Sequence, residues 1–292
     1  MAAVTLEQIK KLRELTGAGM TDCKKALEAT NGDMEAAVEY LRKKGAAAAA
    51  KRVDRSADEG LIWIAENPDH TAAALVEVNC ETDFVARNEQ FADFARAIAE
   101  AALRQKPQTL QELLQASING KTVEDALNET LAKFGEKIVI KRFSVIETEG
   151  YLTSYIHPGN RLGVVVEFNQ APASDEVAQG YRDIAMQIAA MSPLAVGRED
   201  LDPAVVEKEK AVYREQVQQQ GKPEHIAERI VEGKMNKFYQ EVALIEQSFV
   251  KNPDITVQKY LEELSEKQGS PVTIRRFWRY QLGEQVEQPV EQ

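Results

Sequence analysis

The sequence predicts an α+β protein. It consists of a small N-terminal three-helix module, a duplicated core of β-hairpins covered by helices, a protruding helical hairpin, and a C-terminal helix and strand. Two observations support this prediction: helical periodicity at the N-terminus and in 197–235, and a strand–turn–strand–helix pattern that recurs 90 residues later. Because one hairpin with one covering helix leaves a sheet face exposed, we expect the two units to pack together.

Three short helices are expected in residues 1–45. Thr5 and Gln8 fit a capping box for the first helix, Thr21 is a candidate cap for the second, and Asp33 is a candidate cap for the third. Gly45 is the expected end of the third helix. The apolar residues expected to face the small core of the first and third helices are Leu6, Ile9, Leu12, Leu15, Ala37, Val38 and Leu41.

The core begins after a predicted linker at 46–58, which is rich in alanine and has no amphipathic pattern. The first repeat is expected at 59–146, and the second at 147–196 together with 236–250. In both units a glycine and an asparagine are separated by 19 positions and bracket a Pro-containing turn. Strand, turn, strand and helix are therefore expected in each unit.

A third strand is expected in each half of the core, at 137–143 ("KIVIKRF") and 272–278 ("VTIRRFW"). Apolar and basic residues alternate in both segments, which predicts one solvent-exposed face. Two helices, at about 108–116 and 122–134, should precede the first of these strands.

The C-terminal part begins with a helical hairpin at 197–235, which either projects from the body or packs on another subunit. Asp202-Pro203 is a favourable helix start, and the turn falls at 221–223. A C-terminal module at 251–283 should contain a helix at 256–267 and the last strand, followed by a disordered tail at 284–292.

Composition restricts the classes of function. The formal net charge of −11 argues against direct binding to nucleic acid or to anionic membranes, because phosphate affinity comes from clustered basic residues. Two cysteines, Cys23 and Cys80, cannot form a disulfide framework, so a reducing compartment is expected. With no signal-peptide pattern and no apolar run long enough to span a bilayer, we expect a cytoplasmic protein.

Catalytic motifs are scarce. The three histidines are far apart in sequence, no Cys or His spacing matches a metal site, and no phosphate-binding glycine loop is present. Both cysteines are interpreted as structural. We therefore expect a binding protein with no catalytic residues, no metal and no cofactor.

The segment 79–88, "NCETDFVARN", contains two helix-start signals where one would suffice. Thr82 or Asp83 can cap a short turn at 83–87, and Asn88 can cap a longer helix at 89–103. Phe84, seven residues before Phe91, either joins the buried stripe of that helix or projects as an aromatic anchor for a partner. The pattern alone allows both interpretations.

Several segments resemble the elongation factor Ts family. These are 12–45, "EVNCETDFVARN" at 77–88, "SYIHPGNRLGVVVE" at 154–167 and "ERIVEGKMNKFYQEVALIEQSFV" at 228–250. The resemblance extends through Gly283, and the N-terminal module is similar to the ubiquitin-associated (UBA) type. Thr21 is a departure, since relatives can carry a second methionine there.

The resemblance implies a guanine-nucleotide exchange factor, not an enzyme, that binds GDP-bound and nucleotide-free elongation factor Tu and promotes GDP release by disturbing Mg²⁺ and GDP binding. Phe84 would insert beside the partner's switch II helix. The hairpin resembles a dimerising coiled coil, which implies a homodimer in some relatives. The residues implied to contact elongation factor Tu are Leu12, Arg13, Met20, Thr82, Asp83, Phe84, Val85, Phe134, Gly135 and His157.

Two rival functions remain at this stage. The first is a ubiquitin-like-module scaffold protein without exchange activity, which would recover no translational GTPase in a pull-down. The second is an undetected enzyme, which would lose turnover on substitution of His157.

Overall fold

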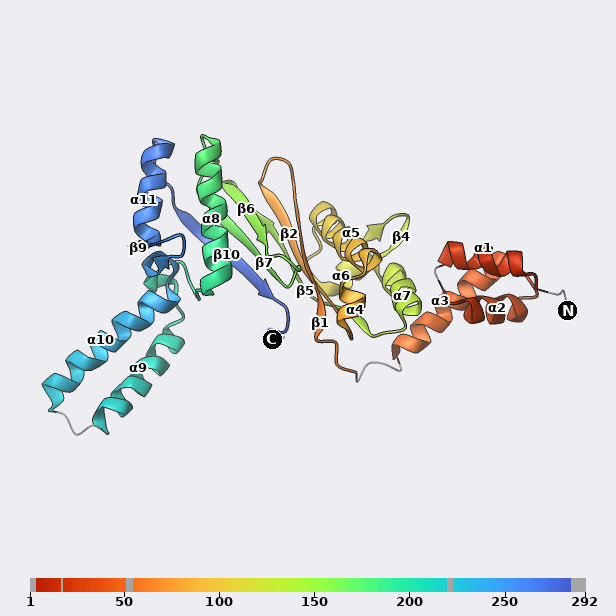
Figure 1. Cartoon of the computed structure of the whole chain (residues 1–292), viewed down its shortest axis with the longest axis horizontal. Coiled ribbons are helices and arrows are strands. Elements are labelled where there is room, and N and C mark those ends of the chain that lie inside the picture. Colours follow the sequence, from red (N-terminus) through yellow and green to blue (C-terminus); the bar gives the residue numbers. More distant parts are fainter. Residues whose placement is uncertain (1–3, 17, 51–54, 220–222, 285–292) are drawn as a thin grey trace.

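The computed structural model describes residues 4–16, 18–50, 55–219 and 223–284, and it confirms the α+β fold (Figure 1). Three helices form the N-terminal module: α1 (Leu6–Thr16), α2 (Met20–Ala29) and α3 (Met34–Ala50). The expected capping box is present, since the Thr5 amide donates to Gln8 Oε1 (2.9 Å) and the Gln8 amide donates to Thr5 Oγ1 (3.2 Å). Asp33 also caps α3, through the Ala36 amide at 3.0 Å.

Several expectations for this module were wrong. Gly19, not Thr21, is the N-cap of α2, and α3 continues past Gly45 to Ala50. Three expected core residues lie on the surface: Leu6, Leu15 and Val38. Three short helices enclose little volume, so this core is small and the outer residues of each helix stay exposed.

The first repeat forms a three-stranded antiparallel sheet in the order β1-β2-β5, built from β1 (Glu59–Glu66), β2 (Ala72–Cys80) and β5 (Ile138–Glu147). The chain between β2 and β5 forms α4 (Asp83–Ala86), α5 (Glu89–Gln105), α6 (Leu110–Gln115), a minimal ribbon of β3 (Ser117–Ile118) and β4 (Lys121–Thr122), and α7 (Val123–Phe134). Thr109 and Thr122 cap the two helices that were expected at 108–116 and 122–134.

The second repeat reproduces this arrangement. Its sheet has the order β10-β7-β6, from β6 (Tyr151–Ile156), β7 (Leu162–Phe168) and β10 (Ile274–Gln281), and α8 (Asp175–Met191) corresponds to α5. The turns match in detail, because His70 and Asn160, 90 positions apart, both have a φ of 55°. Each third strand also carries a bulge, beside Arg142 in β5 and beside Arg276 in β10.

The core is arranged in layers of helix, sheet, sheet and helix. One face of the first sheet packs on α5, and one face of the second packs on α8 and α11 (Figure 1). The remaining faces meet each other through residues that include Ile62, Leu75, Leu152 and Val165. In the two predicted third-strand segments, Lys141, Arg275 and Arg276 are exposed as expected, whereas Arg142 is half-buried. The facing sheet buries Ile146 and Tyr280, which follow these segments in β5 and β10.

The hairpin projects from the end of the second repeat (Figure 1). Its helices are α9 (Pro203–Gln218), for which Asp202 is the N-cap as expected, and α10 (Glu224–Val242). After it come β8 (Ser248–Phe249), β9 (Asn252–Thr256), α11 (Val257–Gln268) and β10. Residues 51–54 of the expected linker and 285–292 of the expected tail lie outside the described residues, and the division into modules at the stated positions stays a prediction. Among the helices described, none has the length and apolar character needed to span a membrane.

Candidate protein-binding site

The segment after β2 uses both of its helix-start signals. Thr82 caps α4, accepting a hydrogen bond from the Val85 amide at 3.4 Å, and Asn88 caps α5, accepting one from the Gln90 amide at 2.9 Å. Asn88 itself has an extended backbone conformation (φ −78°, ψ 130°), so it separates α4 from α5. The four residues of α4 therefore form a turn of their own and do not continue the stripe of α5.

This separation decides the position of Phe84. Its side chain is 84% exposed, whereas Val85 and Ala86 are buried and Phe91 is completely buried. The interpretation in which Phe84 belongs to the buried stripe is therefore wrong. Asp83 is half-exposed beside it and pairs with Arg87 at 3.2 Å. An aromatic ring and a carboxylate thus stand together on the surface of a turn whose other half is anchored in the core.

The turn is held by contacts with the start of β5, 54 residues later in the sequence. Glu136 accepts hydrogen bonds from the Thr82 amide (3.0 Å) and the Thr82 hydroxyl (2.7 Å). In the opposite direction, Glu81 accepts a hydrogen bond from the Lys137 amide at 2.5 Å. Sequence reasoning missed both glutamates. In the sequence, each glutamate is recognisable only as a residue at the end of an apolar strand. That these two strand ends lie side by side becomes known only from the pairing of β2 with β5.

Phe134 and Gly135 lie directly beside this link. Phe134 is half-buried and meets Phe91 edge-on, with 6.3 Å between ring centroids. Gly135 is exposed, has a φ of 72° and is the C-cap of α7, where its amide donates to the Leu131 carbonyl. A left-handed C-cap of this kind strongly favours glycine. The two predicted residues are thus close to the Phe84 turn through Glu136.

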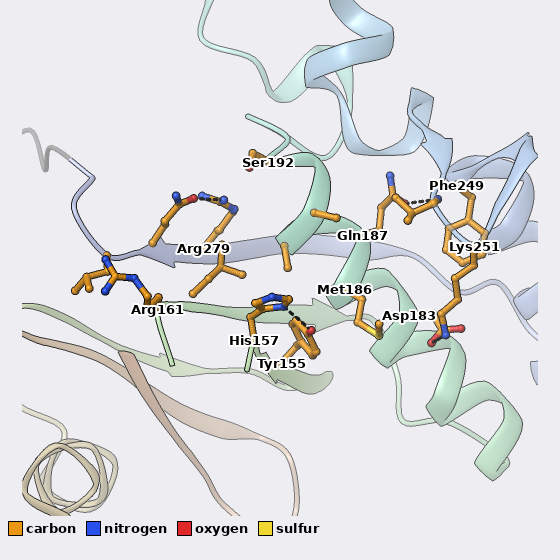
Figure 2. Close-up of a pocket in the computed structure, with 16 residues that line it drawn as sticks. Tyr155, His157, Arg161, Asp183, Met186, Gln187, Ser192, Phe249, Lys251 and Arg279 are labelled. Carbon is orange, nitrogen blue, oxygen red and sulfur yellow. Dashed lines mark hydrogen bonds and ion pairs between the residues drawn. The ribbon is translucent and has the colours of Figure 1, made fainter. Parts of the chain in front are cut away.

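His157 lies at the same end of the core, in the turn between β6 and β7. It is exposed, and its Nδ1 lies 2.9 Å from the Tyr155 hydroxyl. Arg161 of the same turn forms an ion pair with Glu59, which is paired in the sheet with Cys80 at the base of the Phe84 turn. Figure 2 shows His157 and Tyr155 at an open pocket with Met186 and Gln187 of α8.

The N-terminal module approaches this region from the side of α7. Arg42 of α3 contacts Asp125 at 3.2 Å, and a groove between the module and the core is lined by Arg13, Gln90 and Lys133 among others. Arg13 is exposed, and Met20 is half-buried against the module's own core. Leu12 is fully buried, so its side chain has no free surface and supports the helix that carries Arg13.

Nothing in the site resembles catalytic machinery. Across the described residues, no cluster of three or more His, Cys, Asp or Glu side chains could hold a metal ion. Burial, followed by the negative charge of Glu136, raises the pKa of Cys80 to about 12, and burial also raises the pKa of Cys23. Neither thiol has the depressed pKa of a nucleophile. What the arrangement can do is present an aromatic anchor, a carboxylate and an imidazole to a protein surface.

Comparisons with known proteins give a consistent result. Residues 81–284 match the family described as elongation factor TS, and residues 4–41 match the UBA/TS-N domain. The chain is 47% identical over 289 residues to elongation factor Ts of Prosthecochloris aestuarii, covering 97% of this chain and 100% of the relative. It is 46% identical to elongation factor Ts of Clostridium perfringens (99% and 96% covered) and of Aquifex aeolicus (96% and 98% covered).

Proposed function

Because this chain belongs to the elongation factor Ts family, it is a nucleotide exchange factor for elongation factor Tu in translation elongation, and we propose that the exposed Phe84 turn carries the exchange. The observation that supports this proposal is an aromatic side chain that is 84% exposed on a turn with its own helix cap. Aromatic residues, Phe included, are enriched in the cores of protein interfaces relative to the rest of the protein surface.

Exchange requires that the factor bind the nucleotide-free partner more tightly than the loaded one. Linkage makes this relation reciprocal, since the factor weakens the nucleotide by the same ratio by which the nucleotide weakens the factor. A shift of about 10⁴-fold needs about 5.5 kcal/mol of differential binding. Burying one Phe contributes roughly 1.5–3 kcal/mol, so Phe84 cannot act alone.

The remaining contacts are proposed on the surfaces that share this end of the core. Asp83 and Phe84 would enter beside the partner's switch II helix and disturb the groups that hold Mg²⁺. Gly135 and His157 would contact the nucleotide-binding domain, with Thr82, Val85 and Phe134 supporting them from below. Arg13 and Met20 would extend the contact from the N-terminal module, while the buried Leu12 would act only by supporting Arg13.

The proposal is tested with Phe84→Ala. Elongation factor Tu is loaded with a fluorescent GDP analogue, and its release is followed with wild-type and variant protein. We expect exchange efficiency to fall roughly ten- to hundredfold, the equivalent of losing about 1.5–3 kcal/mol of burial. Stability should change by less than about 0.5 kcal/mol, because the ring has almost no contacts to lose.

The matched control is Leu110→Ala, which removes an exposed apolar side chain from α6. It should leave exchange unchanged. Wild-type release by Phe84→Ala, in a protein that still binds elongation factor Tu with full affinity, would remove Phe84 from the mechanism.

We also propose that α9 and α10 pair two copies of the chain. The support is a projecting hairpin that leaves Val205, Val212 and Ile226 exposed and has a groove between its helices, lined by Val206 and Met235 among others. Apolar side chains on a thin hairpin have too little of their own chain to pack against.

A further inference from the structure

The direction of the Phe84 ring depends on the backbone beneath it. Since the side chain is 84% exposed, contacts of its own contribute little to its orientation. The rear of the turn is fixed by Val85 and Ala86, which are buried in the core of the first repeat. At the front of the turn, the Thr82 carbonyl accepts a hydrogen bond from the buried Cys80 thiol at 3.2 Å, and the Glu136 carboxylate holds the Thr82 amide and hydroxyl.

The Glu136 contact is bidentate and reaches into α4. One carboxylate oxygen accepts from the Thr82 amide at 3.0 Å, and the other accepts from the Thr82 hydroxyl at 2.7 Å. The same hydroxyl oxygen accepts from the Val85 amide at 3.4 Å. A continuous chain of hydrogen bonds therefore connects the start of β5 with the first turn of α4, and two of them end on a charged group, which strengthens them.

These contacts extend the sheet beyond its last backbone pair. The β2–β5 ladder ends at Cys80 opposite Ile138. Beyond it, the Glu81 carboxylate accepts from the Lys137 amide, and the Glu136 carboxylate accepts from the Thr82 amide. Side-chain oxygens thus take the place of ladder carbonyls for two further residues, and α4 starts from a rigid strand end.

We propose that Glu136 is a positioning residue for exchange, acting through the Thr82 cap to hold Phe84 in its projecting orientation. This inference rests on the proposed role of Phe84. A turn that is ordered before binding avoids the entropy cost of ordering it in the complex. We call the hydrogen bonds between Glu136 and Thr82, and between Thr82 and Val85, the Glu136 clamp. The Glu136 clamp thus raises the efficiency of exchange without contacting the nucleotide.

The first test is the exchange efficiency of Glu136→Ala, measured by release of the fluorescent GDP analogue. We expect about a tenfold loss, equivalent to about 1.4 kcal/mol. Glu136→Gln retains one acceptor oxygen and should lose less. Two variants of Thr82 test the same contact from its other partner. Thr82→Val, which lacks the hydroxyl, should lose exchange like Glu136→Ala, and Thr82→Ser, which keeps the hydroxyl, should retain it. If Glu136→Ala does not fold, the comparison of Thr82→Val with Thr82→Ser still shows whether the Glu136–Thr82 contact supports exchange.

The second test measures, in the protein without its partner, how strongly the Thr82 amide is protected by its hydrogen bond to Glu136. Hydrogen exchange at the Thr82 amide should become faster in Glu136→Ala, while the Phe94 amide in the buried part of α5 keeps its protection. Unchanged protection at Thr82 would overturn the inference whatever the activity.

The third test separates positioning from direct contact with the partner. If Glu136 acts through the Phe84 turn, adding Glu136→Ala to the double variant Asp83→Ala/Phe84→Ala should cause no further loss of exchange. Additive losses would show an independent action and overturn the inference. Wild-type exchange by Phe84→Ala would refute the proposed function, whereas a slow Phe84→Ala with a fast Glu136→Ala would refute only the positioning role.

The control for these tests is Glu147→Ala. This carboxylate lies at the other end of β5, is paired with Lys106 and is far along the strand from the Phe84 turn. Its removal should leave exchange at the wild-type rate, because surface ion pairs contribute little.

Discussion

At the scale of single residues, Glu66 is a half-buried carboxylate with an unsatisfied oxygen. It lies at the end of β1, where Ser154 of the second repeat donates to its Oε2 (3.1 Å) and His70 Nδ1 lies 3.6 Å away. Its Oε1 and the His70 Nδ1 are buried without a hydrogen-bond partner among the described residues. Burial raises the pKa of Glu66, with the nearby His70 opposing the shift.

The raised pKa has a consequence for stability. The folded protein holds the Glu66 proton more tightly than the unfolded chain, so stability falls as pH rises from about 4.5 through the raised pKa. At neutral pH the ionised carboxylate therefore costs free energy. Glu66→Gln keeps an acceptor for Ser154 and can donate to His70 Nδ1, so we expect it to be more stable than wild type at pH 7 by about 1 kcal/mol.

Urea unfolding at a series of pH values between 4.5 and 8 measures this effect. The advantage of Glu66→Gln should shrink toward pH 4.5, because a growing fraction of the wild-type carboxyl is protonated as pH falls through its raised pKa. Glu147→Gln, which changes an exposed carboxylate, should show no such trend. A Glu66→Gln protein that is less stable than wild type at every pH would contradict the assignment.

At the scale of elements, the hairpin differs from the core in how its helices pack. Its cluster contains Val217, Val231, Met235 and Phe238, which lie between α9, α10 and the segment around Ala195. This single layer of side chains fills the space between α9 and α10. Val205, Val212 and Ile226 remain exposed to solvent. The pairing proposed above would cover them.

Val212→Glu tests this pairing. A charge placed on an apolar contact should dissociate the proposed dimer, so light scattering should give a dimer mass for wild type and a monomer mass for the variant. Leu110→Glu, which places a charge on the exposed surface of α6, should retain the dimer mass. A monomeric wild-type protein at micromolar concentration would rule out the pairing, while exchange activity should be unaffected by either substitution.

At the scale of the whole molecule, Arg142 is one of the side chains that join the two repeats. Arg142 donates from Nε to the buried Glu77 at 2.7 Å, contacts the Gln281 carbonyl and Glu284 at the end of β10, and lies 4.0 Å from the Tyr280 ring centroid. The corresponding Arg276 pairs with the buried Glu167 at 2.6 Å within its own sheet and is largely exposed. Both repeats therefore contain the arginine–glutamate pair, but within the described part of the chain only Arg142 of the two arginines also contacts the other repeat.

Arg142→Ala should therefore cost far more than Arg276→Ala. Removing Arg142 leaves the Glu77 carboxylate buried without its cation, which typically costs about 3–5 kcal/mol. Glu167 keeps Thr148 and Arg275 when Arg276 is removed, so we expect a loss of about 1 kcal/mol. Urea unfolding of the two variants compares them directly, and equal losses would show that the contacts of Arg142 stabilise the fold no more than those of Arg276 do.

Local patterns were the most predictable part of the fold. The Thr5–Gln8 box, the Asp33 cap, the two starts at Thr82 and Asn88 and the repeat offset of 90 were all confirmed. Each depends on residues within a few positions of one another, or on a repeated local pattern. Expectations about faces were less successful: Leu6 and Leu15 were expected in the core and are exposed, because burial depends on which element packs opposite.

The sequence by itself determined the family, the repeated hairpin-and-helix units and the presence of a second helix start after Thr82, since these follow from motifs and short-range capping. Only the tertiary structure decided that Phe84 projects, because a spacing of seven residues fits a buried stripe as well as a separate turn. It also decided that Glu136 holds that turn. The two partners are 54 residues apart, and only the pairing of β2 with β5 brings their hydrogen-bonding groups within reach.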